Sequence, residues 1–286
     1  MTEIINLRFS TQEFFEPYIR HHPKFNKKWM KKIWPDSVAV LEMDLSDPDV
    51  IEFLEYLRSK EDYCVHFINR RYTKKELYGA AMLSFWTSMQ LDFTAEESGC
   101  EFITPCGICE GARVPKDNQL ILNLSQIPKD KDIADTISNN ELIFSERVKD
   151  LVEHHNIQGV ELYPVQHWKK VAPAKKWFYV KINSIIKISE KTIFGNAYQG
   201  EQLLIDQVPK SSCGHSIIHT ETRSEYYLKR DSWDKADILR SDWIFGTHPK
   251  GSVGYPSPQT FISQKFYTIL REHNIKGFTV DVAHLV

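Results

Sequence analysis

The chain lacks both a long hydrophobic run and a recognisable export signal. Nowhere does an apolar segment reach the roughly 18 residues that a membrane-spanning helix needs. The first residues, MTEIINLRFS, lack the basic and apolar regions of a signal peptide. Cysteine is scarce, and its five residues, an odd number, do not suit a framework of disulfides. We therefore expect a cytoplasmic protein with reduced thiols.

The short motifs of common catalytic sites are missing as well. GxSxG, HExxH, GxxxxGK[ST] and GxGxxG do not occur. The 36 basic and 38 acidic residues give a net charge of −2, so no overall field attracts nucleic acid or an anionic membrane. We predict that the protein is not an enzyme. An unrecognised active site in a cleft between repeats is the alternative.

The sequence does contain a repeated segment. Residues 145–159 (SERVKDLVEHHNIQG) and 263–277 (SQKFYTILREHNIKG) align without a gap. Unrelated segments of this length share roughly one identity. These two share five, which indicates a duplication. The identical pairs are Ser145/Ser263, His155/His273, Asn156/Asn274, Ile157/Ile275 and Gly159/Gly277.

Each copy is predicted to form a helix, a tight turn and a strand. Ser145 and Ser263 can cap helices whose apolar residues recur at i, i+3 and i+4. Asn156 and Asn274 tolerate the left-handed conformation that ends a helix, and alternating strands follow each glycine. The apolar stripes are Val148, Leu151 and Val152 in the first copy and Phe266, Ile269 and Leu270 in the second.

The similarity extends upstream of the helices. An Asp-Ile pair occurs at 132–133 and again at 237–238. The first pair is preceded by Cys106-Gly107-Ile108-Cys109, and the second by Lys210-Ser211-Ser212-Cys213-Gly214. The wider spacing in the second copy predicts an insertion in the Gly- and Pro-rich segment 246–258.

These patterns predict a mixed α/β (α+β) fold with two related C-terminal lobes and an N-terminal α/β segment packed on them. The expected boundaries are 1–99 for the N-terminal segment, 100–190 for the first lobe and 191–286 for the second. Alternating residues over 177–188 predict a strand that links the lobes. Ser46-Asp47-Pro48-Asp49 predicts a helix start with the serine as its cap.

Cys106 and Cys109 form the only motif of the metal-binding type. Two thiolates at this spacing can bind one side of a tetrahedral zinc, which needs four ligands. Cys213 and His215 are candidates for the others, with Cys100 as a further one. The second copy has lysine at one cysteine position, which rules out a four-cysteine site from the two knuckles. We therefore expect free thiols and no cofactor, with a structural Cys3His zinc site as the alternative.

Residues 21–34, HHPKFNKKWMKKIW, form a basic stretch with interleaved aromatic residues. Such a surface can contact an acidic protein, because tryptophan and charge together make interface anchors. Stacking and phosphate pairing with nucleic acid, or an amphipathic helix with aromatic residues in the core, are alternatives. The candidate partner-binding residues are Lys27, Lys28, Trp29, Lys31 and Lys32.

The repeated knuckle, Asp-Ile pair, capped helix and (H)NIxG turn resemble the bacterial proteins known by a double CxxCG motif. The resemblance covers roughly residues 75–286 and departs from the motif at Glu110 and Lys210. Those proteins look like relatives of predicted immunity proteins of polymorphic toxin systems. The resemblance implies a non-catalytic protein that binds and neutralises a cognate toxin. A zinc-knuckle regulator or nucleic-acid-binding protein is the alternative.

Overall fold

The protein divides into two compact units in the computed structural model. Residues 1–10, 24, 38–58, 65–91, 100–103, 112–136, 141–169, 173–195, 202–204, 207, 225–245 and 257–286 are described. Unit 1 comprises Met1–Thr73, Ile193–Gln207 and Glu221–Ser224; unit 2 comprises Lys74–Thr192, Val208–Thr220 and Glu225–Val286. Within the described ranges, no helix has the length and apolar character needed to cross a membrane.

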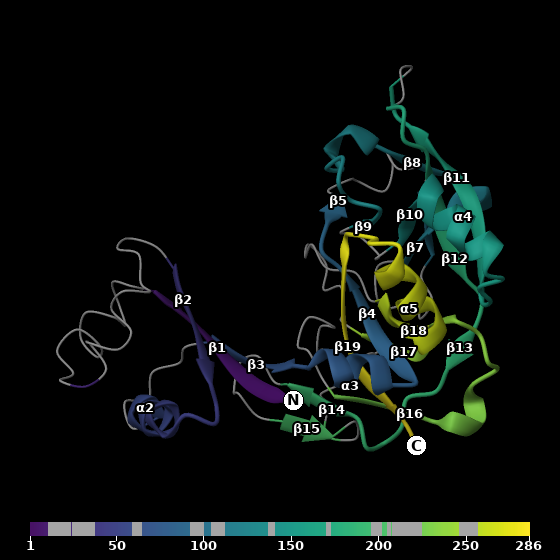
Figure 1. Ribbon diagram of the computed structural model, residues 1–286. Coiled ribbons are helices and arrows are strands. Elements are labelled where there is room, and N and C mark those ends of the chain that lie inside the picture. Colours follow the sequence, from purple (N-terminus) through teal and green to yellow (C-terminus); the bar gives the residue numbers. More distant parts are fainter. Residues whose placement is uncertain are drawn as a thin grey trace. The chain divides into compact units, whose positions relative to one another are not determined.

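Unit 1 is built around a three-stranded antiparallel sheet (Figure 1). Strand β1 (Thr2–Ser10) lies between β2 (Val38–Asp44) and β3 (Val65–Arg71). Helix α2 (Pro48–Arg58) shares a core with this sheet. The buried residues of that core are Ile5, Leu7, Leu41, Met43, Val50, Phe53 and Leu57. A ribbon of β14 (Ile193–Gly195) and β15 (Gln202–Leu204) also belongs to unit 1.

Helix α2 begins near the predicted position but with a different cap. Pro48 is the first helical residue, so Asp47 precedes the helix, and its Oδ1 accepts the Asp49 N–H at 2.9 Å. The Ser46 hydroxyl and N–H instead donate to Asp44 Oδ1 at 2.7 and 2.8 Å. These hydrogen bonds favour the charged carboxylate and lower the pKa of Asp44.

Unit 2 contains two six-stranded sheets (Figure 1). Sheet one has the order β5-β9-β10-β12-β11-β8, and sheet two has the order β13-β17-β18-β4-β19-β16. The strands of sheet one are β5 (Gln90–Leu91), β8 (Leu120–Leu122), β9 (Ile133–Thr136), β10 (Ile143–Ser145), β11 (Val160–His167) and β12 (Trp177–Ile182). Those of sheet two are β4 (Met82–Thr87), β13 (Ile185–Ile186), β16 (Tyr226–Leu228), β17 (Ile238–Phe245), β18 (Ser257–Ser263) and β19 (Phe278–Leu285).

The two sheets match strand for strand and in register. In sheet one the antiparallel pair β10–β12 sets Ser145 opposite Trp177. In sheet two the pair β18–β4 sets Ser263 opposite Met82. The outer strands β8 and β16 each run parallel to their neighbour, as do β5 and β13. The duplication predicted from the repeated segments is therefore present in the tertiary structure.

This equivalence reveals an exchange of strands between the copies. Strand β4 precedes every strand of sheet one in the sequence, yet it lies between β18 and β19 in sheet two. Its counterpart β12 lies between β10 and β11 in sheet one. Along the chain the copies therefore span 82–167 and 177–285, and each contributes its first strand to the sheet of the other. The predicted linking strand over 177–188 divides accordingly, since β12 joins sheet one and β13 joins sheet two.

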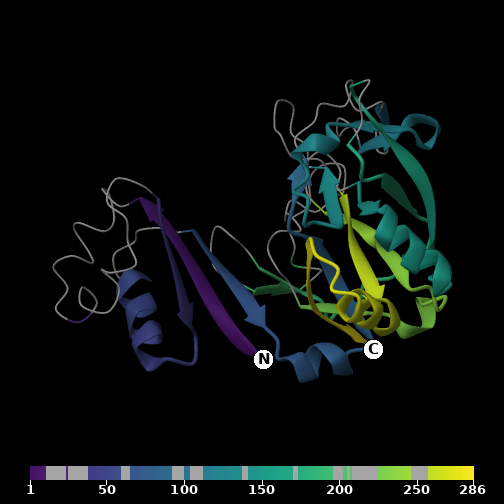
Figure 2. The same cartoon turned by 45° about the horizontal axis from the view of Figure 1, so that its top comes forward.

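Both repeat helices pack into one core that the two copies share. Helices α4 (Glu146–His154) and α5 (Gln264–Glu272) lie side by side (Figure 2). The ring centroids of Phe144 and Phe266 are 6.0 Å apart, and the equivalent residues Leu151 and Ile269 belong to the same core. Other buried members include Leu83, Phe85, Ile133, Val148, Val152, Ile238, Ile262 and Leu270. The predicted mixed α/β (α+β) class with an internal duplication is confirmed.

Short elements complete unit 2. Helix α3 (Lys74–Gly79) precedes β4, and β6 (Cys100–Ile103) pairs with β7 (Ala112–Pro115). The 3-10 turns are η3 (Lys116–Asn118), η4 (Leu124–Gln126) and η5 (Arg230–Ser232). The distance in sequence between equivalent residues grows from 105 at Ile133/Ile238 to 118 at Ser145/Ser263. Of these 13 extra residues, eight lengthen β17 and β18 by four each relative to β9 and β10, and five lie in the segment between the two strands. The added length thus falls around the predicted insertion at 246–258 and includes parts of both strands.

Candidate binding site

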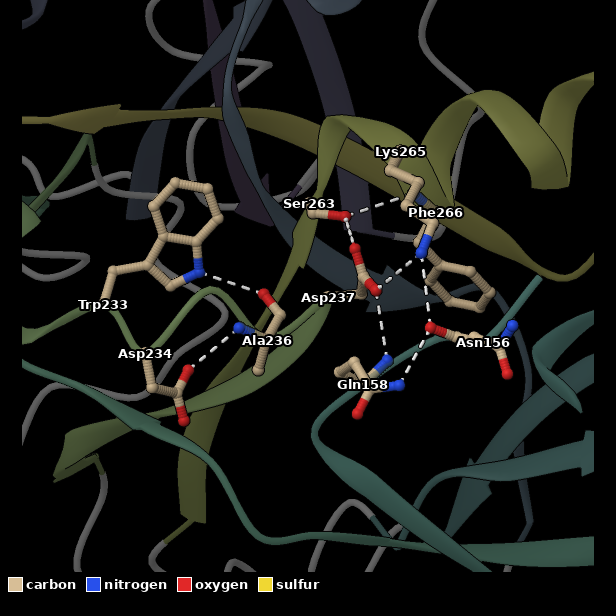
Figure 3. Close-up of polar contacts among 9 residues, drawn as sticks. All are labelled: Asn156, Gln158, Trp233, Asp234, Ala236, Asp237, Ser263, Lys265 and Phe266. Carbon is tan, nitrogen blue, oxygen red and sulfur yellow. Dashed lines mark hydrogen bonds and ion pairs between the residues drawn. The ribbon is translucent and has the colours of Figure 1, made fainter.

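Each copy holds the helix–strand turn of the other copy through a buried aspartate. In the contact that we call junction two, Asp237 accepts hydrogen bonds from the Ser263 hydroxyl at 2.7 Å and from the Gln158 N–H at 3.1 Å (Figure 3). The N–H groups of Asp237 and Ile238 donate in return to the Gln158 carbonyl at 3.0 and 3.1 Å. These donors replace the water that a carboxylate loses on burial.

Junction one repeats this arrangement with the copies interchanged. Asp132 accepts hydrogen bonds from the Ser145 hydroxyl at 3.1 Å and from the Lys276 N–H at 3.5 Å. The N–H groups of Asp132 and Ile133 donate to the Lys276 carbonyl at 2.9 and 3.2 Å. Lys276 is the equivalent of Gln158, one residue before the turn glycine. The two copies are therefore locked together reciprocally.

Both turns need their glycine for its conformation and for space. Gly159 and Gly277 have φ angles of 101° and 110°, a region that side chains rarely adopt. A Cβ atom on either residue would overlap the carbonyl oxygen of the isoleucine that follows the buried aspartate. Asn156 and Asn274 have φ angles of 50° and 51°, the left-handed conformation that the sequence predicted.

The two equivalent serines differ as helix caps. Ser263 Oγ accepts the Phe266 N–H at 3.2 Å while its hydroxyl donates to Asp237. Ser145 occupies the same position before α4, but its side chain makes no capping hydrogen bond to that described helix. Its hydroxyl donates to Asp132. Capping by the side chain is thus observed for the second serine alone of this pair, and both serines support the reciprocal lock.

The cations beside the two aspartates also differ. In junction one, Lys175 Nζ lies 2.9 Å and Arg147 Nη1 3.6 Å from the Asp132 carboxylate. In junction two, Lys265, the equivalent of Arg147, lies 3.3 Å from Asp237. The Lys175 ammonium also donates to the Lys131 carbonyl. Among the residues that the structure describes, Asp132 therefore has two ion-pair partners and Asp237 has one.

An open cleft of about 500 Å³ lies at junction one. Its lining comes from both copies and the segment between them, namely Lys129, Asp130, Asp132, Glu146, Arg147, Lys175, Asn274 and Lys276. Four cationic side chains face three carboxylates, a surplus of one positive charge. The side chains of Lys129 and Lys276 are exposed and form no ion pair with any residue that the structure describes.

The Glu146 carboxylate of the cleft already forms an ion pair with Lys176, which is not one of the lining residues. Glu146 Oε1 lies 2.7 Å from Lys176 Nζ. The hydrogen bond to Glu146 is the main cause that raises the pKa of Lys176, and the negative charge of Glu146 raises it further. Because Asp132 and Glu146 are both paired, Lys129 and Lys276 are the cations of the cleft that remain available to an incoming anion.

The corresponding positions of junction two carry fewer charges. Strand register and the aligned turns give three pairs of equivalent residues, Lys175/Ala80, Lys276/Gln158 and Glu146/Gln264. Asp234 accepts the Ala236 N–H at 2.9 Å. The Lys235 ammonium lies 4.2 Å from the centroid of the Trp233 ring, a cation–π contact. The geometry of the lock is shared, whereas the charge around it is not.

The histidines of the repeat lie at the helix ends. His155 and His273 occupy the C-cap positions of α4 and α5. Their ring centroids are 6.0 Å apart, and the His154 ring lies 4.8 Å from that of His155. The Arg147 guanidinium donates to the His273 carbonyl. The two helix ends therefore meet where the copies contact each other.

The residues predicted for zinc and partner binding lie outside the described residues. They are Cys106, Cys109, Cys213 and His215 for zinc, and Lys27, Lys28, Trp29, Lys31 and Lys32 for a partner. In the same basic stretch, Lys24 pairs with Glu52 at 2.5 Å and Asp49 at 2.9 Å. These hydrogen bonds raise the pKa of Lys24. No cluster of three or more potential metal ligands occurs among the residues that are described.

Sequence reasoning did not identify the cleft at junction one. Its lysines are far apart in the sequence, from position 129 to position 276, and meet where the turn of one copy contacts the other copy. The available signal was the difference in charge between the aligned turns, Gln158 against Lys276. Comparison with known proteins found no matching family model and no matching curated protein.

Proposed function

We propose that this protein is a non-catalytic, immunity-type protein that binds a cognate protein toxin and thereby neutralises it. The observation that carries the proposal is the charged cleft at junction one, whose Lys175 and Lys276 are replaced by Ala80 and Gln158 in junction two. The copies agree in their buried lock and differ at its surface. Such divergence suits a rigid scaffold with one partner-specific face, because a few surface side chains dominate binding energy.

The use of the buried serines supports binding over catalysis. A catalytic serine needs a neighbouring base and access to its substrate. Ser145 and Ser263 are 0% and 5% exposed, and each donates directly to an aspartate. The same contact recurs in both copies, so it serves the shared fold. The resemblance to double CxxCG proteins adds the toxin as the expected partner.

Co-expression with a toxin tests the proposal. The chain is produced with an inactivated form of the toxin domain encoded in the adjoining gene, and complexes are separated by size-exclusion chromatography with light scattering. We expect a one-to-one complex, and restored growth when the active toxin is used. Circular dichroism shows whether the chain is folded. A folded chain that neither forms the complex nor restores growth overturns the proposal.

A further inference from the structure

We infer that the cleft at junction one binds an acidic segment of the protein partner, with Lys129 and Lys276 as the principal contacts. This inference rests on the proposed function for the nature of the partner. The charges of the cleft indicate the chemistry of the segment, which we infer to be a short run of aspartate or glutamate side chains. The cleft of about 500 Å³ has room for a few such side chains.

The available positive charge comes from opposite copies. Lys129 precedes β9 in the first copy, whereas Lys276 lies in the turn between α5 and β19 of the second. Lys175 and Arg147 face Asp132, which already offsets part of their charge. Neighbouring carboxylates of one segment can therefore reach two cations that are free of ion pairs with the described residues. Asn274 adds an exposed amide that can donate a hydrogen bond.

The acids of the cleft favour discrete carboxylates over a phosphate backbone. Nucleic-acid binding draws its affinity from many phosphate contacts in a surface of one sign. Here Asp130 and Glu146 stand among the cations, and the whole chain has a net charge of −2. A phosphate chain would meet repulsion at the positions between its contacts. Separate carboxylate side chains can approach the two lysines and avoid the acids.

The turn that carries Lys276 is held rigidly, which favours recognition. The Lys276 carbonyl accepts two backbone hydrogen bonds, from Asp132 and Ile133. The next residue, Gly277, packs closely against the backbone of Ile133, so that an added Cβ atom would overlap the Ile133 carbonyl oxygen. A cation on a fixed backbone loses less conformational freedom on binding than one on a mobile loop.

A peptide titration tests the assignment. Fluorescence anisotropy of labelled hexaglutamate is measured at an ionic strength of about 0.01 M, where screening is weak. We expect saturable binding that is at least about tenfold weaker for the double variant Lys129→Glu/Lys276→Glu, because charge reversal turns attraction into repulsion. The matched control is Lys74→Glu/Lys75→Glu, which makes the same charge change at exposed residues of α3. It should bind like the unaltered chain.

Three outcomes overturn the assignment. They are the absence of saturable hexaglutamate binding, an equal loss in both double variants, and tighter lysine-dependent binding of a hexathymidine oligonucleotide. Circular dichroism melting of every variant shows that the fold is retained. Peptide binding without a toxin complex would refute the proposed function and leave the cleft assignment standing. If a toxin complex forms, is unaffected by Lys129→Glu/Lys276→Glu and no peptide binds, the cleft assignment is refuted and the proposed function stands.

Discussion

Junctions one and two have the same backbone geometry and different charges. In each, the N–H groups of a buried aspartate and of the next residue donate to the turn carbonyl of the other copy, at 2.9 and 3.2 Å in junction one and at 3.0 and 3.1 Å in junction two. The aspartate carboxylate accepts the turn N–H at 3.5 Å in junction one and at 3.1 Å in junction two. Around this lock, junction one presents Lys175 and Lys276, and junction two presents Ala80 and Gln158. The two copies are therefore constrained where they hold each other and have diverged where they face solvent.

The constraint has a physical origin in burial. Asp132 and Asp237 are each 5% exposed, so replacing either leaves buried donors without an acceptor. Exposed lysines contribute little to stability, since surface ion pairs are typically worth only about 0–1 kcal/mol. Positions around the lock can therefore change in one copy while the fold remains.

The largest effect is expected from the turn glycines. Gly159→Ala and Gly277→Ala should each lower the free energy of unfolding by more than about 3 kcal/mol, since the φ angle and the overlap with a carbonyl oxygen both oppose a side chain. Urea unfolding followed by circular dichroism measures this change. Gly79→Ala is the control, because nothing lies within 4 Å of its added Cβ. It should change stability by less than about 1 kcal/mol. If only one of the two turn-glycine variants lost much unfolding free energy, the two junctions would not be equivalent.

A smaller effect is expected from the buried aspartates. Asp132→Asn and Asp237→Asn should each cost about 2 kcal/mol, the usual scale for losing hydrogen bonds to a charged group. Because Asp132 also has two ion pairs, the cost of its replacement should fall more with added salt. Urea unfolding at low and high salt measures both quantities. The exposed Asp130→Asn serves as control and should stay within about 0.5 kcal/mol. Equal salt dependence at the two aspartates would contradict the electrostatic difference.

The serines should show the smallest effect. Ser263→Ala removes a donor to Asp237 and a helix cap, and should cost about 1.5 kcal/mol. Ser145→Ala removes the donor to Asp132 and should cost about 1 kcal/mol. The same unfolding measurement, made on both variants, gives the difference directly. A greater loss at Ser145 would mean that the single observed cap contributes nothing.

Much of the repeat could be predicted because its signals are local. The apolar stripes of α4 and α5 follow the helical period, and Gly159 and Gly277 mark turns that require positive φ angles. The strands predicted after these turns are observed as β11 and β19, and each is eight residues long. The cap of α2 was misplaced by one residue. Serine and aspartate cap equally well, so propensity does not separate them.

The strand exchange could not be predicted. Strands β4 (MLSFWT) and β12 (WFYVKI) occupy equivalent places, yet no residue is identical at their matched positions. A central strand needs only side chains that suit its neighbours, and many combinations do. The cleft shares this limitation, because Lys129 and Lys276 come together through tertiary contacts between the copies.

The duplication and the positions of its helices and tight turns follow from the sequence alone, because helical periodicity and left-handed turns depend on neighbouring residues. The sheet that each first strand completes, and the charged side chains that meet at the junctions, are known only from the folded protein. Almost any sequence can form backbone hydrogen bonds between strands, because every residue except proline has a donor and an acceptor. The strand with which another strand pairs therefore depends on packing across the whole core. The same packing places the lysines of two distant segments around one cleft.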